Sequence, residues 1–270
     1  MKRSHPYHII PLSKWPIITS FSLLGVTSGA VMYMHDYLFG KYLFVLSIVT
    51  LIYCMIGWWI DVINESMVEK AHTKQVRHGL RIGMSIFILS EIMFFFVFFF
   101  SFFYSSIFPV GILDGIWTIK SGTWPPKGIT TIDPWDIPLM NTLILLLSGT
   151  AVTWANYELD NNNTKEACRG LGYAIILGVA FSLMQFYEYY HASFKFTEGV
   201  YASNFYMATG FHGIHVIVGI IFLTVCYFRI KQRHHNRGKS RLGVEFASWY
   251  WNFVDVIWLF LFAFIYVWGA

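Results

Sequence analysis

Seven long apolar segments, each of about 20 residues, dominate this 270-residue chain. A segment of about 20 apolar residues can cross the hydrocarbon core of a bilayer as a helix. The segments cover approximately 16–33, 42–59, 82–103, 139–157, 170–189, 205–228 and 247–268. Only 13% of the residues are charged, whereas soluble domains carry about 25%. The sequence therefore predicts an all-α polytopic membrane protein with seven transmembrane helices, forming a single membrane domain over residues 1–270.

The connections between these segments are short and carry few other signals. The longest contains SGTWPPKGITTIDPWDIP, residues 121–138, whose Pro and Gly spacing predicts an ordered surface loop. The basic N-terminal tail has no small-residue cleavage site, so we expect no removable signal peptide. The three cysteines lack a CxxC pair, which predicts packing roles rather than a disulfide or thiolate metal site: Cys54, Cys168 and Cys226.

The distribution of basic residues predicts the orientation of the chain. Of its 19 Lys and Arg residues, fifteen fall on the side that holds the N-terminus and four on the other side. The positive-inside rule then places the N-terminus inside and the C-terminus outside. This basic face indicates topology and attraction to anionic lipids, with a specific lipid or partner site at Arg229 and 231–241 as the alternative. Nucleic-acid binding is excluded, because the charges lie on short loops against a bilayer.

Glu91 is the single carboxyl group in the run ILSEIMFFFVFFFSFF, residues 88–103. An ionised carboxylate is costly in an apolar environment, so we expect Glu91 to be largely protonated and functional. His212 and His215 lie three residues apart on one face of the sixth helix, and we expect one of them to pair with Glu91. The pair is interpreted either as an interhelical clasp, of about 1–2 kcal/mol, or as a clasp that also stores or relays protons.

The other polar groups in the segments favour structural roles. Glu188, in QFYEYYHASF, is predicted to be a partly hydrated carboxylate at the membrane boundary. Asp255 is expected to pair with a neighbour in the bundle or in another chain. Two histidines alone cannot complete a metal or haem site, so no metal is predicted. Nearby glycines are expected to allow close helix approach: Gly210, Gly213 and Gly219. No segment carries the polar stripe of a transporter or channel, although a multipass transporter stays an alternative on composition alone.

Several long motifs together resemble the cytochrome c oxidase subunit III family over nearly the whole chain. They are HGLRIGMSIFILSEIMFFF, TWPPKGI, PWDIPLMNTLILLLSGTAVTWA, YEYYHASF, ATGFHGIHVIVG and FASWYWNFVDVIWLFLFAFIYVWG. The equivalent subunit of a quinol oxidase is the alternative with the same fold. The sequence departs from the common family pattern at Asn156 and Asn252, where many members have His.

The resemblance implies an architecture and a role. The first two helices, about 16–60, would form a V with the other five, about 80–269, around a lipid-filled cleft. The chain would have no catalytic residues and no cofactor, since haem a and copper belong to partner subunits I and II. Its implied role is to stabilise subunit I, keep proton uptake rapid during reduction of oxygen to water, and provide a lipid route for oxygen. Smaller accessory subunits are further expected partners.

The resemblance also implies particular site residues and a compartment. Glu91 stands at the position of the family's buried, carbodiimide-labelled glutamate. The residues that would border lipid headgroups are Trp59, Glu65, His72 and Arg229. The expected location is the mitochondrial inner membrane, with the bacterial plasma membrane as the alternative.

Overall fold

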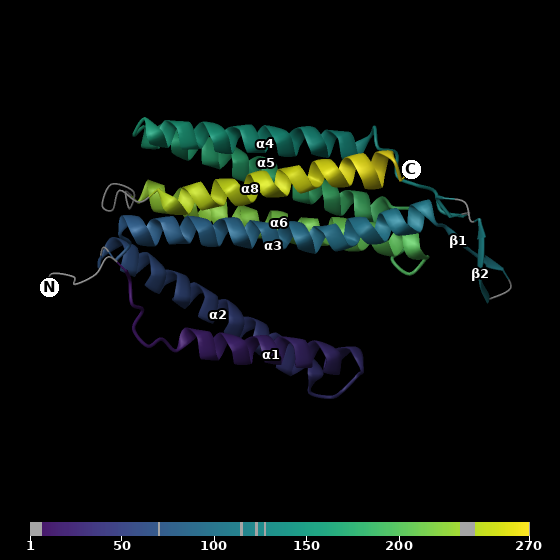
Figure 1. Cartoon of the computed structure of the whole chain (residues 1–270), viewed down its shortest axis with the longest axis horizontal. Coiled ribbons are helices and arrows are strands. Elements are labelled where there is room, and N and C mark those ends of the chain that lie inside the picture. Colours follow the sequence, from purple (N-terminus) through teal and green to yellow (C-terminus); the bar gives the residue numbers. More distant parts are fainter. Residues whose placement is uncertain are drawn as a thin grey trace. The chain divides into compact units, whose positions relative to one another are not determined.

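The computed structural model describes residues 7–69, 71–113, 116–121, 124–126, 128–232 and 241–269. These residues include seven helices long and apolar enough to cross a membrane (Figure 1), which confirms the predicted all-α polytopic fold. The helices are α1 (Trp15–Met34), α2 (Gly40–Met67), α3 (Lys74–Ile107), α4 (Ile137–Asp160), α5 (Thr164–His191), α6 (Val200–Lys231) and α8 (Leu242–Leu261), which the π-helix η1 (Phe262–Val267) continues.

The helices extend beyond the apolar segments that predicted them. α3 has 34 residues, which corresponds to about 51 Å at 1.5 Å per residue, whereas the hydrocarbon core is about 30 Å thick. The predicted segment 82–103 therefore covers only the apolar middle of α3. Hydropathy identifies the part that matches hydrocarbon, but a helix can continue through polar residues where water or headgroups are within reach.

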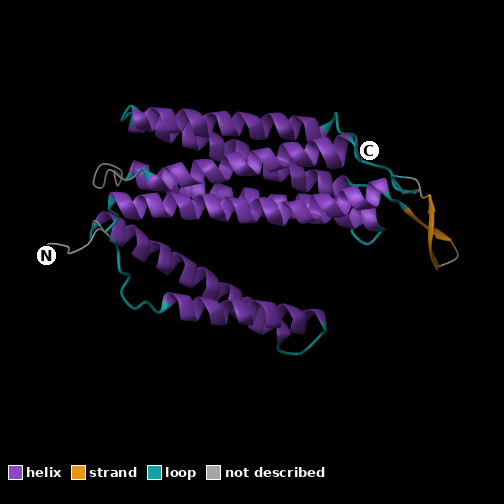
Figure 2. Cartoon of the chain, in the orientation of Figure 1, coloured by secondary structure: helices purple, strands orange, loops and turns teal. Residues whose placement is uncertain are grey.

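A short β-hairpin follows α3 and was not predicted. Its strands β1 (Val110–Leu113) and β2 (Ile116–Ser121) pair antiparallel, with Leu113 opposite Ile116, and appear in orange in Figure 2. The strands are four and six residues long. Strands this short give a weak periodic signal. The predicted ordered loop, residues 121–138, begins only at the last residue of β2.

The chain divides into two compact units, residues Met1–Leu80 and Arg81–Ala270. The first contains α1, α2 and the beginning of α3, and the second contains the rest of α3 and the remaining elements. The V between the helix groups and its lipid-filled cleft stay predictions.

In the first unit, α1 and α2 pack along a narrow seam. The buried residues of each helix recur every seven positions, which keeps them on one face: Trp15, Ser22 and Gly29 on α1, and Gly40, Ser47 and Cys54 on α2. A Cβ at Gly29 would lie 2.7 Å from the backbone nitrogen of Phe44, and a Cβ at Gly25 would collide with Ser47. Gly25 and Gly29 thus form a small-residue motif that brings two membrane helices into backbone contact.

In the second unit, Trp251 of α8 is fully buried at the centre of four helices. Its ring fills the space that Gly178 of α5 and Gly219 of α6 leave open, since a Cβ at either glycine would lie 2.7 Å from the ring. The indole Nε1 donates a hydrogen bond of 3.1 Å to Ser148 Oγ on α4. This one side chain therefore connects α4, α5, α6 and α8.

The predicted role of the α6 glycines holds for only one of them. Gly219 faces Trp251, but nothing lies within 4 Å of a Cβ placed at Gly210 or Gly213. The prediction of close helix approach is therefore wrong for these two. Gly210 and Gly213 lie nine and six residues before Gly219, so they point about 180° and 120° away from it around the helix. Of the three, only Gly219 faces α8.

Candidate functional site

Glu91 of α3 and His215 of α6 form a contact in the middle of the second unit. Glu91 Oε2 lies 2.8 Å from His215 Nε2. Their side chains are 22% and 14% exposed, respectively. The structure thus brings together two residues that are 124 positions apart in the sequence.

The second ring nitrogen of His215 determines how many protons this contact holds. Nδ1 lies 2.7 Å from the carbonyl oxygen of Phe211, one turn earlier on α6. A carbonyl oxygen only accepts, so Nδ1 carries a hydrogen and donates it. If the ring is neutral, Nε2 has a lone pair and Glu91 must be the protonated donor; if the ring is cationic, Glu91 is a carboxylate. Both forms place one shared proton between Glu91 and His215, and both leave the pair without net charge.

Aromatic rings surround this proton-sharing pair. The His215 ring centroid lies 5.0 Å from that of Phe95 and 6.3 Å from that of Tyr250, which stacks on it. Phe94 adds a third ring at 6.0 Å. An apolar enclosure penalises net charge, and a pair that is neutral in both forms suits it.

His212 takes a different partner, although it lies on the same helix. Its Nε2 lies 3.1 Å from the carbonyl oxygen of Val254 on α8 and donates to it. The ring is buried between Phe181 and Trp258, with centroid distances of 5.7 and 5.2 Å. His212 therefore links α6 to α8, whereas His215 faces Glu91.

Glu188 and Asp255 both lie inside the bundle. The prediction of a partly hydrated Glu188 is wrong, because it is only 3% exposed. Its Oε1 accepts hydrogen bonds from Tyr266 (2.6 Å) and from Gln185 (3.1 Å), which the sequence did not reveal as partners. Asp255 is 7% exposed, and a side chain at Gly149 of α4 would collide with its carboxylate. The aromatic residues around Glu188 are typical of the membrane boundary, which predicts nearby water. In the structure, Tyr266 of η1 lies against the Glu188 carboxylate instead.

Of the predicted lipid-contact residues of the first unit, Trp59 and Glu65 lie in the last part of α2, and His72 lies in the connection that follows it. Trp59 is 57% exposed, whereas Glu65 and His72 are partly buried. Burial lowers the pKa of His72, and the nearby His8 and Arg77 lower it further against the opposing effect of Glu65. This environment therefore favours the neutral form of the His72 ring. His8, which the sequence analysis missed, lies beside both Glu65 and His72.

Arg229, the fourth predicted lipid residue, lies near the end of α6 in the second unit. Its Nε is buried and has no hydrogen-bond partner in the described part of the chain. A Cβ at Gly243 would approach its Nη1 to 2.9 Å, so the guanidinium lies against the start of α8. Most of the basic connection 231–241, proposed as a lipid or partner site, lies outside the described residues.

Comparison with known proteins decides the family. The sequence profile of "Cytochrome c oxidase subunit III" matches residues 5–270. The chain is 57% identical to the "Probable cytochrome c oxidase subunit 3" of Rickettsia bellii, covering 99% of this chain and 97% of that protein. It is 48% identical to the "Cytochrome c oxidase subunit 3" of Prototheca wickerhamii, covering 99% of each. The chain belongs to the cytochrome c oxidase subunit III family.

Membership of the subunit III family fixes the coarse function and location. The chain is a subunit of cytochrome c oxidase, an oxidoreductase complex, and assembles with other oxidase subunits. The part of the chain that the structure describes has seven helices long and apolar enough to cross a membrane, so the chain is a multi-pass protein of an inner or plasma membrane. The relatives include both the bacterial genus Rickettsia and the plant Triticum aestivum, which is 47% identical over 98% of this chain and 97% of its own. The multipass transporter is therefore excluded.

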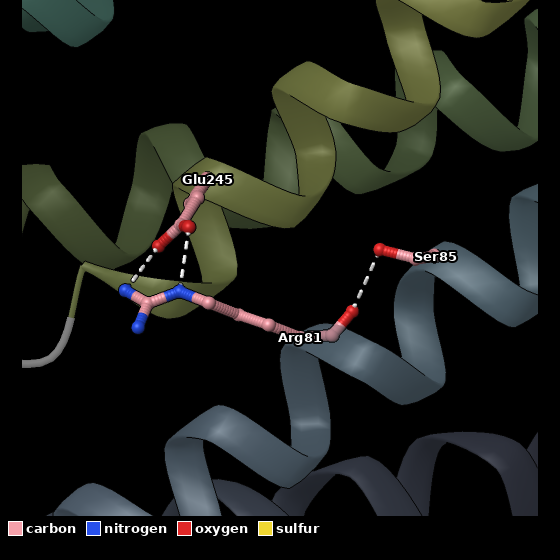
Figure 3. A network of polar contacts seen from close by, with 3 residues as sticks. All are labelled: Arg81, Ser85 and Glu245. Carbon is pink, nitrogen blue, oxygen red and sulfur yellow. Dashed lines mark hydrogen bonds and ion pairs between the residues drawn. The ribbon is translucent and has the colours of Figure 1, made fainter.

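The subunit III fold contains an ion pair that the sequence analysis did not predict. Arg81 Nε and Nη2 donate to the two carboxylate oxygens of Glu245 on α8 at 2.7 and 2.9 Å, as Figure 3 shows. Ser85 Oγ, one turn further on α3, donates to the Arg81 carbonyl at 3.0 Å. The sequence contains one indication of this ion pair: Arg81 and Glu245 both lie near helix ends on the same predicted side of the membrane. The bidentate geometry fixes α3 against the first turn of α8.

A charge reversal tests this connection. We expect Arg81→Glu and Glu245→Arg each to loosen α3 from α8, because each places two like charges together. The double variant restores an opposite pair and should recover most of the loss. The measurement is the thermal release of the chain from the purified oxidase. Additive losses in the double variant would contradict a direct interaction.

Proposed function

We propose that this chain is a core subunit of cytochrome c oxidase that holds no cofactor and no catalytic residue, while subunits I and II hold haem a and copper. It stabilises subunit I, keeps proton uptake rapid and contributes a lipid route for oxygen. The proposed location is the mitochondrial inner membrane, with the N-terminus in the matrix and the C-terminus in the intermembrane space. The bacterial plasma membrane is the alternative, which the Rickettsia relatives favour.

The observation that carries the proton-related part is the contact between Glu91 and His215. An acidic proton held at 2.8 Å between two side chains can be exchanged without creating net charge in an apolar site. The clasp itself joins α3 to α6, so it also stabilises the bundle. Proton storage and mechanical linkage are thus two roles of one pair, and His212 strengthens the bundle through Val254.

The lipid-related part is supported by the polar groups near the helix ends. Trp59 offers an exposed indole, and Glu65 and His72 offer partly buried polar atoms in the same unit. Arg229 has a buried Nε without a described partner, which a lipid phosphate would satisfy. Phospholipids with zwitterionic or anionic headgroups fit this mixture of donors and acceptors.

Substitution of Glu91 separates the two roles of the pair. Glu91→Gln keeps a donor for His215 Nε2 but has no acidic proton, so we expect the chain to remain bound while proton uptake slows. Glu91→Ala removes the hydrogen bond as well, and should also weaken the packing of α3 on α6 by about 1 kcal/mol. Proton uptake by the purified oxidase is measured with a pH-indicator dye after mixing with oxygen.

The matched control is Ser90→Ala, which alters the adjacent exposed position of α3 and leaves the pair intact. It should behave as the wild type in both measurements. Wild-type proton uptake in both Glu91 variants would refute the proton-storing role and leave only the clasp. Reduced uptake in Glu91→Ala alone would assign the effect to packing.

A further inference from the structure

The N-terminal segment, α2 and the connection to α3 bring two imidazoles and one carboxylate together. One ligand atom from each of His8, Glu65 and His72 lies within 4.8 Å of those of the other two. His8 Nδ1 is 4.0 Å from Glu65 Oε2, and the two imidazole centroids are 6.2 Å apart. All three residues belong to the first unit and are partly buried. It is the one such group of three among the described residues.

A backbone hydrogen bond places His72 beside Glu65. After α2 ends, the amide of Ala71 donates to the Glu65 carbonyl at 2.9 Å. This bond joins residues six positions apart, so it holds Ala71 against the last turns of α2. His72 follows Ala71 directly, so its ring returns to the position of the Glu65 side chain.

A second anchor brings the N-terminal segment to the same place. Trp15 Nε1 donates to Asp61 Oδ2 at 2.6 Å, and Asp61 precedes Glu65 by about one turn of α2. The Trp15 ring also packs on Gly57, where any side chain would collide with it. The segment that precedes Trp15 therefore joins α1 beside the last part of α2, within reach of Glu65.

We propose that His8, Glu65 and His72 bind a divalent cation of the zinc class. Two imidazole nitrogens and one carboxylate oxygen are a common set of zinc ligands, with a fourth position open to water. In a tetrahedral zinc site the ligand atoms lie about 3.4 Å apart, so the side chains must close by about 1 Å. Mg²⁺ and Ca²⁺ prefer oxygen ligands and do not fit two imidazoles.

The charges around the cluster suit a cation of this kind. The three side chains are partly buried, so a bound cation would be shielded from competing solvent on part of its surface. Glu65 contributes one negative charge, while Arg77 opposes the cation from the start of α3. The expected consequence of binding is that the N-terminal segment is fastened to the end of α2.

The test is a zinc titration of the purified oxidase, after treatment with a chelator, by calorimetry. We expect His8→Ala, Glu65→Gln and His72→Ala each to weaken one zinc-binding event by at least about tenfold. His78→Ala is the matched control, because His78 is a histidine of the same unit outside the cluster, and it should titrate as the wild type. Mg²⁺ should give no difference between the wild type and any variant.

Three results would overturn the proposal. One is identical zinc titrations for the wild type and the three cluster variants. Another is a loss of bound phospholipid phosphate in the Glu65 and His72 variants with unchanged zinc binding, which would assign these residues to lipid alone. The third is unchanged zinc binding in His8→Ala. Because His8 lies outside every described helix, this variant stays informative if the other two fail to assemble. The proposal does not rest on the role of the pair formed by Glu91 and His215.

Discussion

Replacing Gly219 by leucine is expected to destabilise the five-helix part of the chain by about 3 kcal/mol. Even a single Cβ at this position would lie 2.7 Å from the Trp251 ring, and a leucine adds three further carbons. The ring has no free space into which to move, because Gly178 and Ser148 enclose it from α5 and α4. The thermal release of the chain from the purified oxidase measures the loss.

Two further variants make this result specific. Gly213→Leu places the same side chain nearly two turns earlier on α6, where nothing lies within 4 Å of a Cβ, and should behave nearly as the wild type. Trp251→Ala alone should cost about 3 kcal/mol, but it opens space for a leucine introduced at Gly219. The double variant should therefore be more stable than the sum of the two single losses predicts. Strict additivity would show that the clash is not with Trp251.

Gly29→Leu is expected to separate α1 from α2, again at a cost of about 3 kcal/mol. A Cβ at this position would lie 2.7 and 2.8 Å from the backbone N and Cα of Phe44. Backbone atoms cannot rotate away as a side chain can, so the helices must move apart. The measurement is protease cleavage of the turn between α1 and α2 in the purified oxidase.

The control for this variant lies on the same helix. Thr27 is exposed on α1 and bonds only to carbonyl oxygens of its own helix, so Thr27→Leu should leave the protease resistance unchanged. Gly29→Ala should have an intermediate effect, since it introduces only the Cβ. Protease resistance equal to the wild type in Gly29→Leu would contradict the backbone contact between α1 and α2.

The sequence was sufficient for the seven membrane helices but not for their surroundings. Transfer into hydrocarbon depends on composition along a continuous segment, and composition is visible in one dimension. The extension of α3 through residues 74–80 cannot be read from composition in this way. The polar residues there are as compatible with a solvated loop as with a helix. The strands β1 and β2 depend on pairing with each other. Segments this short carry little sequence signal of such pairing.

For the partner of Glu91, the sequence left a choice between two nearby histidines. Buried Glu91 required a partner, and two histidines of α6 were available. Residues three positions apart on a helix differ by about 60° in direction, so the rotation of α6 decides which one faces α3. That rotation follows from the packing of Gly219 against Trp251, a residue far from either histidine in the sequence. His8 was missed because nothing in a short N-terminal tail indicates which helix end it will meet.

The bond between His215 Nδ1 and the Phe211 carbonyl has an electrical consequence. It commits the imidazole to one tautomer, so the remaining proton can only move along the short line towards Glu91. A transmembrane voltage does work on a charge in proportion to the fraction of the field that the charge crosses. Such a hop covers a very small fraction of the membrane thickness, and the occupancy of its two ends should therefore hardly respond when the respiratory membrane is energised.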